Sequence, residues 1–82
     1  MPDEEREATV YNLISKLRAS PVPKAELEKT GFEDWSPAET GQLLSSLLSA
    51  EMVVEDDKGN LSPGKKGLFF FKRVRRKRQG FV

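Results

Sequence analysis

The sequence predicts a small domain that is mainly α-helical and carries a small β-hairpin. Two observations lead to this prediction. Apolar residues recur with helical spacing in two segments, 10–17 and 43–48. Further on, the apolar stretch 52–54 leads into residues 57–60 (DKGN), a turn sequence typical of a hairpin. A length of 82 residues suits one domain, and a hydrophobic content of 37% is too high for a disordered chain.

A first helix is expected at about residues 4–19. Its apolar residues are spaced i, i+3, i+4 and i+7 and therefore share one helix face. They are Val10, Leu13, Ile14 and Leu17. Asp3 is suited to cap the N-terminus, and the segment 20–23 with its two prolines should end the helix.

A short second helix is expected next. Pro23 or Lys24 should lie in its first turn, and Gly31 should end it in a left-handed conformation. Ala25 and Leu27 are expected to face the core.

A third helix is expected at about residues 37–50. Residues 36–39 (SPAE) combine a capping box with proline at the first helical position. The apolar stripe consists of Leu43, Leu44, Leu47 and Leu48. At about 100° per residue, the outward face then holds Gln42, Ser45, Ser46 and Ser49.

The hairpin should follow this helix. Residues 52–56 are expected as the first strand and residues 60–62 as the start of the return strand, which Pro63 and Gly64 end. The apolar run 68–71 is either a last strand or the start of a fourth helix, because periodicity cannot decide over four residues.

The order of these elements resembles a winged helix-turn-helix domain. The likeness lies in segments 22–32 (VPKAELEKTGF), 43–54 (LLSSLLSAEMVV) and 57–67 (DKGNLSPGKKG), and it covers about residues 4–68. It implies three helices with a two- or three-stranded wing. We expect residues 1–71 to form the domain and residues 72–82 to be a basic C-terminal tail, which by its composition adds little to the core. In DNA-binding members the third helix enters the major groove and the wing contacts the backbone.

Charge is divided unequally along the chain. All thirteen acidic residues lie in residues 1–57, together with five of the fourteen basic ones, which gives a balance of −8. Residues 58–82 hold nine basic residues and no acidic one, a balance of +9. Such a concentration of like charge normally meets a polyanion, an anionic surface or bulk water.

The basic segment therefore supplies the candidate nucleic-acid contacts. They are Lys58, Lys65, Lys66, Lys72, Arg73, Arg75, Arg76, Lys77 and Arg78. The outward face of the third helix is a weaker candidate, because no Lys or Arg occurs between Lys29 and Lys58. These observations predict DNA binding, as in a transcription regulator or a chromosome-associated protein, with affinity mainly from the wing and the tail.

Aromatic residues offer two further candidate contacts. Trp35 is suited to anchor a partner, although its position beside Phe32 favours a role in closing the core. Phe69, Phe70 and Phe71 cannot all face inward from one strand, so a protein partner or a homodimer contact is an alternative there.

Several function classes are disfavoured. The chain has no cysteine and no histidine, which removes thiolate metal sites and the commonest general base, and no catalytic residue, metal or cofactor is expected. Residues 59–66 approach a P-loop, but Lys66 stands where its Ser or Thr belongs. The acidic start shows no signal peptide and no run is long enough for a membrane span. The expected location is therefore the cytoplasm of a prokaryote, in association with the nucleoid, or the cytoplasm or nucleus of a eukaryote.

Rival interpretations stay open at this level. A winged helix with an acidic third helix also suits a protein-interaction adaptor. A short basic tail suits an RNA-binding or ribosome-associated protein as well. The tail could also serve only for solubility or nuclear import, or fold back onto the acidic body and be masked there.

Overall fold

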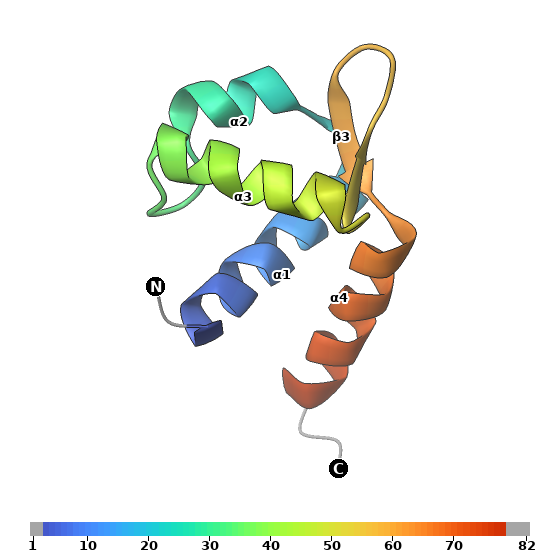
Figure 1. The fold of residues 1–82 in the computed structure, drawn as a ribbon. Coiled ribbons are helices and arrows are strands. Elements are labelled where there is room, and N and C mark those ends of the chain that lie inside the picture. Colours follow the sequence, from blue (N-terminus) through green and yellow to red (C-terminus); the bar gives the residue numbers. More distant parts are fainter. Residues whose placement is uncertain (1–2, 79–82) are drawn as a thin grey trace.

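The chain forms four helices and a three-stranded antiparallel sheet (Figure 1). The structure, a computed structural model, describes residues 3–78. The elements in chain order are α1 (Asp3–Ala19), β1 (Val22–Pro23), α2 (Lys24–Thr30), α3 (Pro37–Ser49), β2 (Val53–Glu55), β3 (Asn60–Pro63) and α4 (Lys65–Arg78). The fold is thus mainly α with a small sheet, an arrangement compatible with a winged-helix-like domain.

One core joins these elements. Its fully buried side chains come from α1, α3 and the sheet, and they include Leu13, Ile14, Leu17, Leu44, Val53 and Leu61. The predicted apolar faces of the first and third helices are therefore confirmed, with Leu48 only half-buried. In Figure 1, α2 and α3 lie above α1, and α4 descends beside α1.

The start of α3 follows the predicted capping box. The Ser36 hydroxyl accepts the Glu39 N–H at 3.1 Å, and the Glu39 carboxylate accepts the Ser36 N–H at 3.0 Å. Hydrogen bonding to the backbone of Ser36, and secondly to its side chain, holds the pKa of the Glu39 carboxyl below its ordinary value. Buried Thr40 accepts the backbone N–H of Phe32 at 3.0 Å and so ties the turn to the helix.

The second helix departs from expectation at one residue. Leu27 is buried as predicted, but Ala25 is exposed, so its inward placement was wrong. Residues two apart lie on nearly opposite sides of a helix, and this seven-residue helix buries only one of them. Gly31 ends the helix as expected and has a positive φ of 79°, but its ψ of 177° is extended and not that of the left-handed helical conformation.

Trp35 closes the core beside this turn. Its side chain is half-buried, and its Nε1–H donates to the hydroxyl of buried Thr9 at 3.0 Å. The indole therefore links the α2–α3 turn to α1, which supports the structural role over that of an anchor.

The segment expected to end α1 and lead into α2 also supplies the third strand. Val22 pairs with Leu61 and Pro23 with Asn60, which places β1 at the edge of the sheet in the order β1-β3-β2. An edge strand tolerates proline because one side of it lacks ladder partners. On the other side of β3, Val53 pairs with Pro63.

The run 68–71 is helical and belongs to α4, so of its two alternatives the start of a fourth helix is confirmed, whereas the winged-helix pattern implied only three helices. The helix continues through residues 72–78, and Val74 is buried with Phe71. The described part of the expected tail thus adds to the core, while residues 79–82 lie outside the described part. The stripe Gly67, Phe71 and Val74 has i, i+4, i+7 spacing, which the surrounding basic residues obscure in the sequence.

A stack of aromatic rings and guanidinium groups joins α4 to α1. The Tyr11 and Phe71 rings are parallel within 7° at 4.7 Å between centroids. The Arg18 guanidinium carbon lies 4.4 Å from the Phe71 centroid, and that of Arg78 lies 4.1 Å from the Tyr11 centroid. Ring stacking and cation–π attraction thus fix the helix against its neighbour.

Two glycines provide a matched test of this packing. We expect Gly67→Ala to destabilise the domain by about 1–3 kcal/mol, because a Cβ there would overlap the Met52 carbonyl oxygen. Gly41→Ala, inside α3, should instead stabilise it by about 1 kcal/mol, since the nearest contact of the new Cβ is Glu28 Oε2 at 3.8 Å. Urea unfolding followed by circular dichroism measures both. Equal midpoints for the two variants would contradict the close approach of α4 to residue 52.

No helix within residues 3–78 is long and apolar enough to traverse a membrane.

Candidate nucleic-acid interface

Helix α4 has two chemically different faces. Gly67, Phe71 and Val74 point into the molecule and are buried. At about 100° per residue, the opposite side carries mainly basic residues and one aromatic ring. These exposed residues are Lys65, Phe69, Lys72, Arg73 and Arg76.

Three of these basic residues lie beside Phe69 on its C-terminal side, and the guanidinium carbon of one of them, Arg73, lies 5.8 Å from the centroid of the Phe70 ring. Lys72, Arg73 and Arg76 follow Phe69 at i+3, i+4 and i+7, and all four side chains line one shallow surface pocket. We call these four residues the Phe69 cluster. Phe69 itself is 73% exposed, which makes it the most exposed large hydrophobic residue of the described chain.

The structure separates the remaining predicted contacts on α4 from this cluster. Lys66 forms an ion pair with Glu51 at 3.3 Å, and Arg78 lies over Tyr11 on the inner side of the helix. Arg75 and Lys77 are exposed on the flanks. The predicted contacts on α4 therefore do not form a uniform patch. Those on the outer side are Lys65, Lys72, Arg73 and Arg76, and the last three belong to the Phe69 cluster.

Lys58 lies apart from the helix. It sits in the turn of the β2–β3 hairpin, where the Asp56 carboxylate accepts the N–H groups of Lys58 and Asn60, each at 2.9 Å. The hairpin points away from the C-terminal end of α4 (Figure 1). Lys58 is thus exposed and firmly placed, but not part of the α4 surface.

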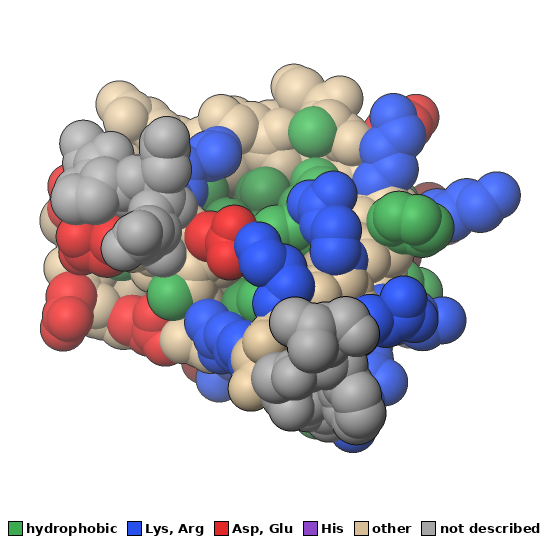
Figure 2. Space-filling view, turned by 90° about the horizontal axis from the view of Figure 1, so that it is seen from below, with side chains coloured by type: hydrophobic (Ala, Val, Ile, Leu, Met, Phe, Trp, Pro, Cys, Tyr) green, Lys and Arg blue, Asp and Glu red, His purple; other side chains and the backbone are tan. Residues whose placement is uncertain are grey.

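The charge separation of the sequence is retained in space. Figure 2 shows Lys and Arg side chains gathered on the α4 side of one face, and Asp and Glu side chains mostly near the start of α1. Hydrophobic side chains occupy the hollow between them. The single ion pair found among the described side chains joins Lys66 to Glu51, so folding leaves most of the α4 charge unpaired there.

The four polar residues predicted on the outward face of α3 are all exposed: Gln42, Ser45, Ser46 and Ser49. Arg6 of α1 lies beside them and lines one surface pocket with Gln42 and Ser46. Sequence reasoning found no cation for this face, because Arg6 reaches it only through the packing of α1 against α3. No local signal in the sequence points to it.

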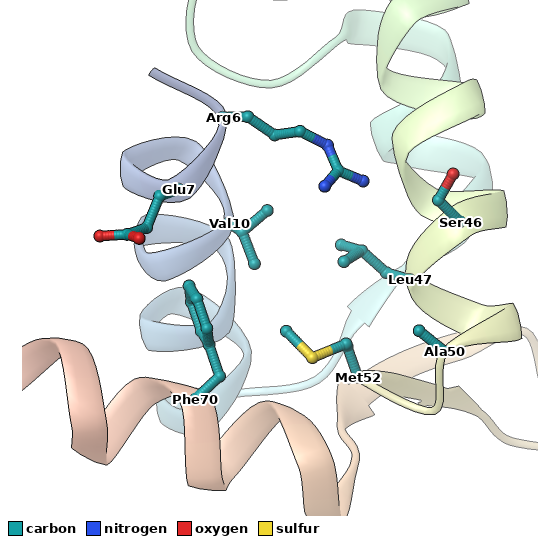
Figure 3. A pocket seen from close by; sticks show the side chains of 8 residues that line it. All are labelled: Arg6, Glu7, Val10, Ser46, Leu47, Ala50, Met52 and Phe70. Carbon is teal, nitrogen blue, oxygen red and sulfur yellow. The ribbon is translucent and has the colours of Figure 1, made fainter. Parts of the chain in front are cut away.

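A groove of about 370 Å³ opens between α1, α3 and α4 (Figure 3). Its walls are mostly apolar, with Val10, Leu47, Met52 and Phe70 pointing toward the same space. The Arg6 guanidinium reaches toward α3 at its rim, while the Glu7 carboxylate turns away. The groove is therefore a mostly apolar depression with one cation, Arg6, at its edge.

Among the described side chains, no three acidic groups come together in a way that could hold a metal ion. What the α4 surface offers is a set of cations around an aromatic ring.

Comparisons of the chain with protein-family models, with curated proteins and with solved structures found no match.

Proposed function

We propose that this chain is a winged-helix domain that binds nucleic acid, in the first place double-stranded DNA. The outer side of α4 provides most of the phosphate contacts, and Lys58 in the hairpin provides a separate one. The protein would act as a small transcription regulator or a chromosome-associated protein.

The order of elements supports the winged-helix assignment. Helices α2 and α3 with the turn between them correspond to the helix-turn-helix, and the β2–β3 hairpin corresponds to the wing. The pairing of β1 with β3 adds the short third strand that the resemblance allows.

The unpaired charge on α4 is the observation that carries the proposal. Residues 65–78 hold eight basic residues and no acidic one, and the outer side of the helix is exposed to solvent. Like charges on one helix face repel one another, so a polyanion lowers this repulsion when it binds. Binding also releases the counterions condensed on the polyanion, which favours the complex. Helix α3 carries no Lys or Arg, so its polar face is better suited to secondary contacts than to the main attraction.

Fluorescence anisotropy with a labelled duplex, at about 50 mM and about 200 mM salt, tests the proposal. If about six cations meet phosphates, log K should fall with log salt at a slope of about −5. Structured RNA as competitor distinguishes RNA binding from DNA binding. Absence of duplex binding at the lower salt concentration would refute the proposal and favour a protein-interaction role.

A further inference from the structure

The Phe69 side chain is exposed to solvent and does not contribute to the core of the fold. Its ring is 73% exposed, whereas its neighbours Phe70 and Phe71 pack on or within the core. A single exposed apolar side chain is normal in itself, so the significance of Phe69 lies in the charged groups that rim it. The rim here is entirely cationic: Lys72, Arg73 and Arg76.

We propose that Phe69 is a stacking platform for an unpaired base, so that α4 binds single-stranded nucleic acid in addition to duplex. The inference rests on the proposed function, since the surrounding cations must already attract phosphates. Aromatic rings stack on bases of any sequence, and cationic side chains beside them hold the backbone of the same strand. The Phe69 cluster brings both components together on one helix face.

The positions along the helix suit a strand that passes over the ring. At about 1.5 Å per residue, Lys65 lies about 6 Å before Phe69 along the axis and Arg76 about 10 Å after it. Cations therefore flank the ring on both sides, and a base stacked on Phe69 would leave the adjacent phosphates within their reach. The apolar surface of the pocket between Phe69 and Arg73 is open to solvent.

Three other occupants fit less well. An intact duplex presents only base edges and so offers Phe69 no ring face. A second copy of this helix would bring two cationic faces together. A membrane-surface helix needs a broad free apolar face, whereas the apolar face of α4 is packed against α1 and the sheet.

The test compares a labelled oligothymidylate with a labelled duplex, each titrated by anisotropy with wild-type protein and variants. Phe69→Ala should weaken binding of the single strand by roughly fivefold to a hundredfold and change duplex binding less than about twofold. Phe69→Tyr, which keeps the ring, should bind the single strand like wild type. Val54→Ala, at another exposed apolar residue that lies on β2, is the matched control and should change neither affinity.

A 2-aminopurine base in the single strand gives a second readout, because stacking on Phe69 should quench its fluorescence in wild type and in Phe69→Tyr but not in Phe69→Ala. Equal single-strand affinity of wild type and Phe69→Ala, with duplex binding intact, overturns the inference and leaves the proposed function standing. If the wild-type protein binds neither the single strand nor the duplex, both the inference and the proposed function are overturned. Binding to phosphatidylserine vesicles that depends on Phe69, with single-strand binding unaffected by the substitution, would assign the cluster to lipid instead.

Discussion

The triple variant Lys72→Gln, Arg73→Gln and Arg76→Gln is expected to bind duplex DNA roughly a hundredfold more weakly than wild type at about 0.1 M salt. Each phosphate contact changes the slope of log K against log salt by about 0.9, and three lost contacts should make the slope less steep by about 3. Anisotropy titrations over a range of salt concentrations measure both quantities. Glutamine has nearly the helix propensity of Lys and Arg, so α4 itself should persist.

A control with the same loss of net charge separates local contacts from overall charge. Lys16, Lys24 and Lys29 lie on α1 and α2 and are not among the proposed phosphate contacts, and changing all three to glutamine also removes three positive charges. This control should keep most of the slope and lose affinity only slightly. If both triple variants lose affinity equally, net charge rather than the surface of α4 determines binding, and the proposed interface is wrong.

Phe71→Ala is expected to lower the free energy of unfolding by about 3–5 kcal/mol. The ring is only 4% exposed, stacks on Tyr11 and carries the Arg18 guanidinium over its face, and a cavity would replace all of these contacts. A domain of this size has a total stability of roughly 4–12 kcal/mol, so the substitution removes a large part of it. Urea unfolding followed by circular dichroism and by Trp35 fluorescence measures the loss.

Phe69→Ala is the matched control, because it makes the same chemical change two residues earlier on the exposed face. Its unfolding free energy should stay within about 0.5 kcal/mol of wild type. Phe71→Leu keeps the measurement possible if Phe71→Ala does not fold, with an expected loss of about 1–2 kcal/mol from the missing stacking. Equal stabilities of Phe69→Ala and Phe71→Ala would show that α4 is not docked on α1 through this ring.

The sequence predicted those parts of the fold that depend on local signals. The capping box at Ser36 and Glu39 determines where α3 begins, and the stripe of leucines determines which side it buries. Ala25 was misplaced because a small residue in a short helix gives little periodic signal. Strand β1 was missed because two residues gain their strand character only from pairing with β3.

The sequence predicted which residues of the candidate site are charged, but not which of them lie together on one surface. The composition identified all the basic residues of α4, but only the helix, with Phe71 and Val74 inside, determines which of them face outward. The orientation of α4 about its own axis also turns Arg78 toward α1, away from the outer side, and places Phe69 among the cations. Arg6 illustrates the limit of such reasoning, since its place beside Ser46 depends on how two distant helices pack.

The junction between the sheet and α4 has a thermodynamic consequence. Only Gly64 separates the end of β3 at Pro63 from the start of α4 at Lys65, and its N–H donates to the Met52 carbonyl at 2.9 Å. A basic segment held in this way is ordered before it meets a ligand, so binding does not require the loss of chain entropy that a disordered tail would suffer. The rigid junction also couples the orientation of α4 to that of the hairpin. When a nucleic-acid strand lies along α4, the direction of the hairpin relative to that strand is fixed, so the protein would bind a polyanion as one rigid body in one defined orientation.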